Sequence, residues 1–432
     1  MYGRDLDEEG AYRLGLAFGA YLKEGSVVVG RDGRKSSPSL AASLVEGLRD
    51  SGVDVLNVGT VPTPTLYYSV RRLRARGGVM VTASHNPPEW NGFKLVGGEA
   101  RPVAMGFGLE TVRGLVDNAR PGEVPGSIRQ VDILDEYIDH VTSLIDLSAG
   151  VGVGIDASNG VASLAAPRAL RDVGCLVEVI NGEVDGDFPG HPPEPLPEYL
   201  KDLSRLVVER GLHLGVAFDG DGDRAVFVDD RGRALTGDQA LALLAHYYLQ
   251  KNPGATVVFD ASSSMAVKEV VESMGGRAVE SRVGSAFIKQ AMAEHRATLG
   301  GERSGHLYFS ELGCMDDAIF ATLRMAELAS SVDSLSELVD SLPKYESVSL
   351  SVECPDEKKR QVVGAVANKL ESIADSVSRI DGVKAYFGGA WVLVRASNTQ
   401  PLVRITAEGR TKREATRLLR VALEALREAG CG

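Results

Sequence analysis

Residues 151–180 read VGVGIDASNGVASLAAPRALRDVGCLVEVI, and this stretch contains one complete α/β unit. An apolar run ends in Asp156, a loop of small residues follows, and an amphipathic pattern predicts a helix over 161–172. A glycine and a second apolar run over 176–180 complete the unit. Continuous apolar runs that alternate with helical periodicity indicate buried strands covered by helices.

The same order of elements occurs twice more in the chain. The first copy consists of a strand ending in Asp32, a helix near 38–49 and a strand over 53–58. The last copy consists of a strand ending in Asp260, a helix near 265–274 and a strand over 277–280. The copies lie roughly a hundred residues apart. This spacing predicts three related α/β domains, because the repeats of a solenoid are far shorter.

From about Lys344 the pattern changes to that of a smaller α+β domain. Strands are predicted over 348–352, 383–387, 391–395 and 402–407, and helices over 355–375 and 412–429. A further helix is expected near the N-terminus, over 8–22. The predicted fold class is therefore α/β, with three related α/β domains plus a C-terminal α+β domain. We place the domains at 1–132, 133–236, 237–343 and 344–432.

The composition is that of a water-soluble globular protein. Of the 432 residues, 44% are hydrophobic and 25% charged, and no apolar run is long enough to span a bilayer. The first residues, Met1–Asp5, lack the apolar segment of a signal peptide. The net charge of −12 argues against a nucleic acid or an anionic membrane as partner.

The four cysteines lie far apart and form no Cys-x-x-Cys pair. They are Cys175, Cys314, Cys354 and Cys431. We therefore expect neither a disulfide framework nor a zinc site, and we interpret the cysteines as small core residues. A reduced, cytoplasmic location is the expectation that follows.

One loop, residues 219–224, has the composition of a cation site. Asp219, Asp221 and Asp223 alternate with glycines between two predicted strands. Three adjacent carboxylates repel one another unless a cation holds them, and a set of oxygen ligands favours Mg²⁺. An EF-hand calcium loop is disfavoured, because it needs glycine where Arg224 stands and glutamate where Asp230 stands. Arg224 is suited to contact a phosphate oxygen.

A second polar loop, residues 82–87, follows the predicted strand 78–81. Here Ser84 offers a hydroxyl nucleophile, and His85 beside it can share a proton. Lys94 returns a positive charge toward the same region, where it could transfer a proton or pair with phosphate. Taken alone, Ser84 and His85 would be consistent with an ordinary loop, and Lys94 with a solvated surface residue.

Two more polar loops complete the set. The loop 301–306 presents short polar groups suited to sugar hydroxyls: Glu302, Ser304 and His306. The loop 395–401 presents a guanidinium, hydroxyls and an amide suited to a phosphate dianion: Arg395, Ser397, Asn398 and Thr399. No Walker-type phosphate loop is present, which disfavours an ATP-driven kinase. Together the four loops predict phosphoryl transfer on a small polar molecule.

In this order, the four loops resemble those of the α-D-phosphohexomutase family, and the resemblance covers essentially the whole chain. It includes Gly30-Arg31-Asp32-Gly33-Arg34 and Pro193-Glu194-Pro195. The resemblance implies four domains around a central cleft. It also implies an intramolecular phosphotransferase, an isomerase that interconverts hexose 1-phosphate and hexose 6-phosphate.

The resemblance further implies a role for each loop. Ser84 would carry the phosphoryl group as phosphoserine and complete the Mg²⁺ shell with Asp219, Asp221 and Asp223. A hexose 1,6-bisphosphate would form as intermediate and serve as activator. Arg224 would offset charge, and His85 and Lys94 would transfer protons. The sugar contacts would come from Glu302, Ser304 and His306, and the phosphate contacts from Arg395, Ser397, Asn398 and Thr399.

The sequence leaves several alternatives open. The loop Ser397–Pro401 resembles that of phosphomannomutase/phosphoglucomutase members more than that of phosphoglucosamine mutases, so mannose or glucose is the expected sugar. A phosphoglucosamine mutase is the alternative. Where the family has an N-terminal Gly-Ile-Arg-Gly-type segment, this chain begins Met1–Asp5. Either the segment is degenerate here, with Arg4 in its place, or it was lost to a different start site, which leaves open a non-catalytic sugar-phosphate-binding regulator. Whether the chain forms a homo-oligomer is also open.

Overall fold

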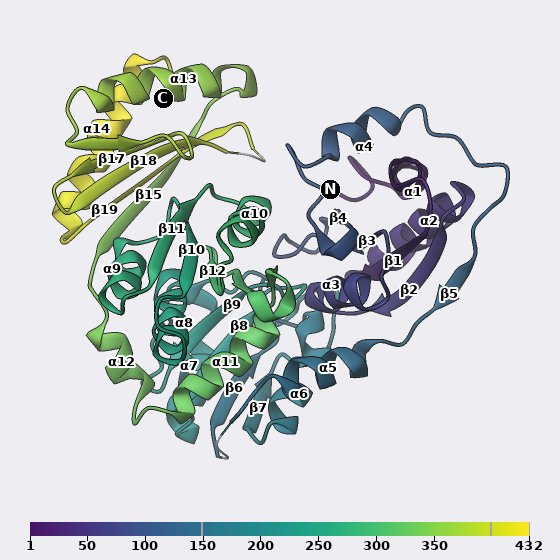
Figure 1. Cartoon of the computed structure of the whole chain (residues 1–432), viewed down its shortest axis with the longest axis horizontal. Helices are drawn as coiled ribbons and strands as arrows, with labels where there is room; N and C mark the ends of the chain where they lie inside the picture. The colour runs from purple at the N-terminus through teal and green to yellow at the C-terminus, as the bar shows by residue number, and fades with distance from the viewer. Residues whose placement is uncertain (148–149, 398–399, 432) are drawn as a thin grey trace. The chain divides into compact units, whose positions relative to one another are not determined.

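The computed structural model describes residues 1–147, 150–397 and 400–431. The chain divides into two compact units. The first comprises Met1–Leu244 with Ser304–Asp340, and the second comprises Ala245–Arg303 with Ser341–Gly432. Within them the architecture confirms the predicted fold class, with three α/β regions and one α+β region (Figure 1).

The first unit begins with a five-stranded sheet in the order β4-β3-β1-β2-β5. Its strands are β1 (Ser26–Arg31), β2 (Asp54–Thr60), β3 (Gly77–Val81), β4 (Phe93–Gly97) and β5 (Ile128–Gln130). Only β4 runs antiparallel to its neighbour. The helices are α1 (Glu8–Leu22), α2 (Ser37–Asp50), α3 (Thr63–Arg72), α4 (Leu109–Leu115) and α5 (Leu134–Ser143).

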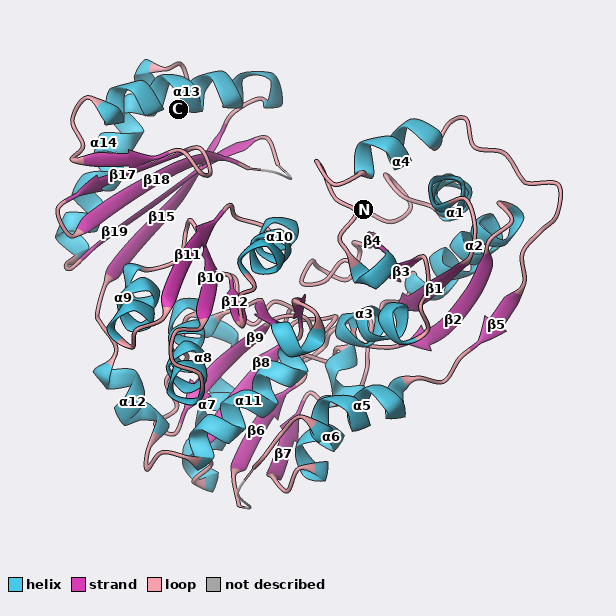
Figure 2. Ribbon diagram, in the orientation of Figure 1, coloured by secondary structure: helices cyan, strands magenta, loops and turns pink. Residues whose placement is uncertain are grey.

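Helices cover both faces of this sheet (Figure 2). Alternate residues of β1 divide between the two faces, so that Val27 and Val29 pack in the core with α1 and α2, and Val28 packs in the core with α3. Fully buried parallel strands of this kind account for the continuous apolar runs in the sequence. Helices α1 and α2 pack closely at Gly15 and Gly47, where neither helix has room for a side chain. A Cβ on Gly15 would lie 2.5 Å from the Leu44 carbonyl oxygen, and one on Gly47 would lie 2.1 Å from the Tyr12 carbonyl oxygen.

A four-stranded sheet in the order β7-β6-β8-β9 follows in the same unit. It contains β6 (Gly152–Asp156), β7 (Leu176–Ile180), β8 (Leu214–Phe218) and β9 (Ala225–Asp229), with β9 antiparallel to β8. Helix α7 (Lys201–Arg210) packs on it, as does α11 (Ala318–Ser330). The prediction of one helix over 161–172 is wrong in detail. A 3₁₀ turn, Val161–Leu164, precedes α6 (Ala166–Asp172), whose Pro167 suits the first turn of a new helix.

The remaining elements of the first unit are short. Strands β13 (Leu307–Phe309) and β14 (Met315–Asp316) form an antiparallel pair. Helix α12 (Leu335–Ser341) contains the end of the first unit at Asp340. Helix α8 (Gly237–Lys251) contains the boundary between the units.

The second unit contains the third copy of the repeated pattern and the C-terminal domain. The parallel strands β10 (Thr256–Asp260), β11 (Arg277–Ser281) and β12 (Leu299–Gly301) are accompanied by α9 (Met265–Ser273) and α10 (Ser285–His295). The C-terminal sheet is antiparallel and has the order β15-β19-β18-β17-β16. Its strands are β15 (Glu346–Glu353), β16 (Ser376–Ser378), β17 (Val383–Phe387), β18 (Ala390–Ala396) and β19 (Leu402–Gly409).

Two long helices, α13 (Asp356–Glu371) and α14 (Lys412–Glu428), share one apolar core with the C-terminal sheet. Trp391 and Leu393 of β18 belong to a separate cluster with Ala261. The predicted helix over 355–375 ends four residues early, at Glu371, after which the chain turns into β16.

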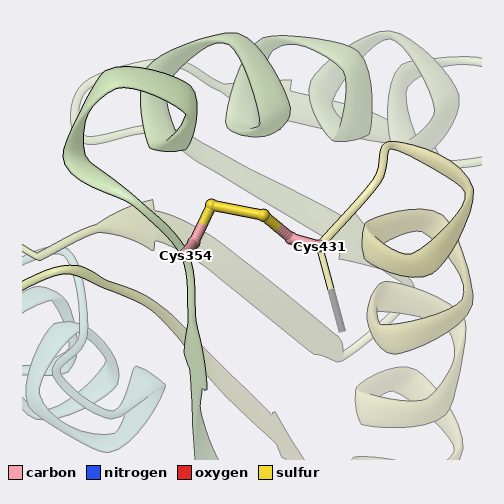
Figure 3. The surroundings of a disulfide bond; sticks show 2 residues. All are labelled: Cys354 and Cys431. Carbon is pink, nitrogen blue, oxygen red and sulfur yellow. A yellow bond between two sulfur atoms is a disulfide. The ribbon is translucent and has the colours of Figure 1, made fainter.

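Cys354 and Cys431 form a disulfide, so the expectation that the chain has none is wrong for this pair (Figure 3). The two Cα atoms lie 5.9 Å apart although the residues are separated by 77 positions in the sequence. The end of β15 and the chain end after α14 meet because both elements pack in one core. Cys175 is a buried free thiol. The cysteine content therefore no longer supports the reduced setting expected from the sequence.

Reducing this disulfide is expected to lower the free energy of unfolding of the second unit by about 2–4 kcal/mol, because the bond constrains a long loop of the unfolded chain. Chemical denaturation with and without dithiothreitol measures the change. The Cys354→Ser variant should already have the lower stability and should not respond to the reductant, whereas Cys175→Ser should lose stability on reduction as the unmodified protein does, because Cys175 is a free thiol. Equal stability of oxidised and reduced protein would contradict the prediction.

Among the residues that the structure describes, no helix is long and apolar enough to cross a membrane.

Candidate active site

The acidic loop connects β8 to β9, and its three aspartates are buried. Asp219, Asp221 and Asp223 are each at most 1% exposed, and their carboxylate oxygens lie within 4.8 Å of one another. Asp219 Oδ1 closes the loop by accepting hydrogen bonds from the backbone N–H groups of Gly222, Asp223 and Arg224, at 3.0, 3.2 and 3.2 Å. The loop turns at Gly222, whose φ of 75° is in the left-handed region that favours glycine.

The electrostatics of this loop fit a hard divalent cation. Burial, together with the charges of Asp221 and Asp223, raises the pKa of Asp219. Asp221 Oδ1 and Asp223 Oδ1 are buried and accept no hydrogen bond from the residues that the structure describes. A cation with oxygen ligands would satisfy both atoms and offset the repulsion among the three carboxylates.

Ser84 reaches this loop from the turn after β3. Its Oγ donates a hydrogen bond to Asp219 Oδ2 at 2.7 Å, and the residue is only 8% exposed. Its φ of 52° places a non-glycine residue in the left-handed region, which L-amino acids rarely occupy. The backbone N–H of Ser84 donates to Thr82 Oγ1 at 2.8 Å, which helps to hold that conformation.

Lys94 of β4 points into the same carboxylate cluster. Its Nζ donates to Asp221 Oδ2 at 2.7 Å and also contacts Asp223 Oδ2. Burial works against the charged form, but the neighbouring carboxylates raise the pKa of Lys94 well above its usual value. Lys94 is therefore an ammonium group here, suited to pair with an anion.

Thr63 is a contact of the acidic loop that the sequence analysis missed. Its Oγ1 donates to Asp221 Oδ2 at 2.6 Å, and its backbone N–H donates to the Asp221 carbonyl at 2.9 Å. Together with Lys94, Thr63 lowers the pKa of Asp221 although burial alone would raise it. Its position in the sequence could have indicated this contact. Thr63 begins α3 just after the carboxyl end of the parallel strand β2, and ligands of α/β sheets bind at such strand ends.

Arg224 and His306 are bonded to each other beside the acidic loop. Arg224 Nε donates to His306 Nε2 at 2.9 Å, and His306 Nδ1 lies 3.1 Å from Asp316 Oδ2. His306 Nδ1 is also 3.7 Å from Asp223 Oδ1. His306 therefore lies beside the acidic loop. The sequence had indicated only a contact with sugar hydroxyls for this residue of the loop 301–306. No motif in the sequence indicated Asp316.

His85 lies in the electrostatic field of the same cluster. Burial, followed by the positive charge of Arg224, lowers the pKa of His85 to about 4. The imidazole is therefore neutral near pH 7 and able to accept a proton. The structure thus brings together eight of the predicted site residues within the first unit: Ser84, His85, Lys94, Asp219, Asp221, Asp223, Arg224 and His306.

The other predicted site residues divide between the units. Ser304 belongs to the first unit, whereas Glu302, which is 6% exposed, belongs to the second. Burial lowers the pKa of Arg395, and Arg404 stands directly opposite it in the β18–β19 ladder. Two adjacent guanidinium groups suit an anion.

The loop after β18 is held from α13. Ser397 is buried, and Lys359 Nζ donates to the carbonyls of Ser397 and Gln400 at 2.7 and 3.2 Å. Asn398 and Thr399 lie outside the described residues. Arg4, the sequence candidate for the family's N-terminal arginine, is 75% exposed and lies 3.3 Å from Asp5.

Models of one protein family match almost the whole chain. The phosphoglucomutase/phosphomannomutase alpha/beta/alpha domains I, II and III match residues 1–109, 135–232 and 236–345, and the C-terminal domain of that family matches residues 350–425.

Individual relatives and solved structures agree with these matches. The chain is 36% identical to a phosphoglucomutase/phosphomannomutase of Thermococcus kodakarensis, covering 98% of this chain and 96% of the relative. It is 37% identical to a probable phosphoglucosamine mutase of Methanopyrus kandleri, covering 96% and 93%. The crystal structure of a phosphoglucomutase/phosphomannomutase family protein from Burkholderia thailandensis superposes with a TM-score of 0.91 at 33% identity, covering 100% and 96%.

Proposed function

Because the chain belongs to the phosphoglucomutase/phosphomannomutase family, we propose that it interconverts the 1-phosphate and 6-phosphate of mannose or glucose, with Ser84 as phosphoryl carrier. It is an isomerase of the mutase type. The observation that carries the proposal for Ser84 is its hydrogen bond of 2.7 Å to Asp219, inside a cluster of three buried carboxylates. A hydroxyl held there needs only a cation and a phosphoryl group to form a phosphoserine centre.

The proposed reaction consists of two transfers that balance each other. In the first, the bond between phosphorus and Ser84 Oγ breaks, a bond to the 6-hydroxyl oxygen of hexose 1-phosphate forms, and the proton of that hydroxyl leaves. The product is a hexose 1,6-bisphosphate. In the second, the 1-phosphoryl group passes to Ser84 Oγ and the 1-oxygen gains a proton, which leaves hexose 6-phosphate and the phosphorylated enzyme. An added bisphosphate would rephosphorylate an enzyme that had lost its phosphoryl group.

We assign Mg²⁺ to Asp219, Asp221, Asp223 and the phosphoryl group on Ser84. The fit rests on the buried carboxylate oxygens of Asp221 and Asp223, which accept no hydrogen bond from the described residues. When bound, the ion would offset negative charge on the transferring phosphoryl group.

The surrounding side chains would provide charge compensation and proton transfer. Arg224 and the ammonium group of Lys94 would contact phosphoryl oxygens, because both carry permanent positive charge beside the acidic loop. Neutral His85 would accept the proton of the attacking hydroxyl. Positioning and charge stabilisation are the main contributions that a protein makes to phosphoryl transfer.

The substrate-binding roles are assigned to the other two loops. Glu302, Ser304 and His306 would bind sugar hydroxyls, and His306 would in addition support Arg224. The phosphate that is not transferred would be bound by Arg395 and Ser397, together with Asn398 and Thr399. We also propose a cytoplasmic location, because highly charged sugar phosphates do not cross membranes unaided.

Glucosamine phosphate is the alternative substrate, and relatives named for both activities support each reading. We expect kcat/KM for glucose 1-phosphate and mannose 1-phosphate to exceed that for glucosamine 1-phosphate by at least about 10-fold, since a site built around hydroxyl partners rejects an analogue that mismatches them. Rates measured side by side, with glucose 1,6-bisphosphate present, test this. A higher kcat/KM for glucosamine 1-phosphate would make the chain a phosphoglucosamine mutase, and binding of all three without turnover would indicate a regulator.

A further inference from the structure

Arg34, in the loop after β1, is an arginine with no exposed surface. Removing a guanidinium from water is unfavourable unless it is paired and every N–H group finds an acceptor. Asp32 supplies the pairing carboxylate at 3.0 Å from Nε. The ring of Phe188 lies 5.0 Å from the guanidinium carbon.

All five N–H donors of Arg34 are used, and four of them bind a single turn of the chain. Nε donates to Asp32. Nη1 donates to two carbonyls and Nη2 to two more, at distances between 2.6 and 3.2 Å. The four carbonyls are those of Ser84, Asn86, Pro87 and Trp90. Arg34 therefore binds the backbone of the loop that presents the nucleophile.

The contact with the Ser84 carbonyl bears directly on the direction of the hydroxyl. Nη2 of Arg34 donates to that carbonyl at 2.8 Å, and a Cβ on Gly220 would lie only 2.6 Å from the same oxygen. The carbonyl is thus held between the guanidinium and the backbone of the acidic loop. With the carbonyl in this position Ser84 has a left-handed φ of 52°, and in this conformation Oγ reaches Asp219.

We propose that Arg34 is a positioning residue for phosphoryl transfer, which fixes the backbone of residues 84–90 so that Ser84 Oγ is aimed at the acidic loop. This inference rests on the proposed role of Ser84. Because its donors are used by Asp32 and the four carbonyls, Arg34 would act through the backbone of this loop and not by contacting substrate or cation. A residue with that role affects the rate of transfer more than the binding of hexose phosphate.

The Arg34→Lys variant tests the proposal, because lysine retains the charge opposite Asp32 but has only three donors on one atom and cannot bind four separated carbonyls. We expect kcat for glucose 1-phosphate to fall by about 100-fold, the order of loss that a small misplacement of a reacting group produces. KM should stay within about twofold. The rate at which a ³²P-labelled phosphoryl group preloaded on Ser84 passes into sugar phosphate on mixing with unlabelled hexose 1-phosphate should fall in parallel.

Lys35→Ala is the matched control. Lys35 follows Arg34 in the same loop, is 72% exposed and pairs with Asp187, so kcat and KM should remain those of the unmodified protein. All assays are made at a temperature at which circular dichroism shows each variant folded. If Arg34→Lys does not fold, Asp32→Asn replaces it. That variant removes the charge that holds Nε and should lower kcat at constant KM.

The outcomes separate this inference from the proposed function. If the unmodified protein turns over hexose phosphates and Arg34→Lys has the same kcat, the positioning role is overturned and the proposed function stands. The same holds for Asp32→Asn where that variant is used. A rise in KM that accounts for the whole loss of kcat/KM also overturns it, since it would indicate a role in substrate binding. Absence of mutase activity from the unmodified protein overturns the proposed function instead.

Discussion

Replacing Ser84 with alanine is expected to abolish mutase turnover, with a loss of at least about 10⁴-fold in kcat, the order seen when a covalent nucleophile is removed. Alanine has no oxygen that can accept the phosphoryl group, so neither of the two transfers can take place. The fold should remain intact, because Ser84 Oγ donates only one hydrogen bond, to Asp219. Conversion of glucose 1-phosphate to glucose 6-phosphate measures the effect.

Two further measurements make the result for Ser84 specific. Intact mass should show one phosphoryl group on the unmodified protein after incubation with glucose 1,6-bisphosphate, and none on Ser84→Ala. Ser39→Ala is the control, because its hydroxyl lies on α2, where it donates to the Ser36 carbonyl at 3.2 Å and lies 3.5 Å from the Tyr2 hydroxyl. Turnover retained by Ser84→Ala would remove the covalent role. Stoichiometric release of inorganic phosphate by the unmodified protein would indicate a phosphatase.

Replacing Asp221 with asparagine is expected to have the second largest effect. The variant should weaken Mg²⁺ binding by at least about 10-fold and lower kcat by about 100-fold, because a neutral amide oxygen is a poorer ligand for a hard cation than a carboxylate. The effect should be large because Asp221 is buried, with one oxygen bonded to Lys94 and Thr63 and the other without a hydrogen bond from the described residues.

Calorimetric titration of Mg²⁺ into protein treated with a chelator measures the affinity, and activity as a function of Mg²⁺ concentration measures the consequence. Asp202→Asn is the matched control, since Asp202 is an exposed carboxylate paired with Arg205 on α7. Its affinity and activity should not change. An unaltered Mg²⁺ affinity in Asp221→Asn would contradict the assignment of the cation to this loop.

The sequence was sufficient for most of the secondary structure. The predicted N-terminal helix over 8–22 coincides with α1, and the predicted strands over 176–180 and 383–387 coincide with β7 and β17. Burial repeats with the period of the element itself, so a local run of residues contains this information. The split between the 3₁₀ turn Val161–Leu164 and α6 was missed, because both segments share one apolar pattern.

The polar loops could be found from the sequence, but not their partners. Ser84 and Asp219 are 135 positions apart, and the sequence indicated their contact only through the resemblance to a family. Thr63 and Asp316 belong to no motif that the sequence indicated, and Arg34 stood in a motif without an assigned role. What each of them does became visible only from the atoms that it contacts. The disulfide was missed for the same reason, since 77 positions separate Cys354 from Cys431.

By itself, then, the sequence determined the repeated α/β units, the final α+β domain and the chemistry that each loop can offer, because propensity, periodicity and side-chain type are local properties. Only the tertiary structure decided which loops meet. The carboxyl ends of β3 and β8 bring Ser84 to Asp219, and Arg34 then fixes the turn that carries the hydroxyl. Such contacts depend on how strands pair and helices pack across long stretches of chain, and no local pattern of residues encodes that pairing.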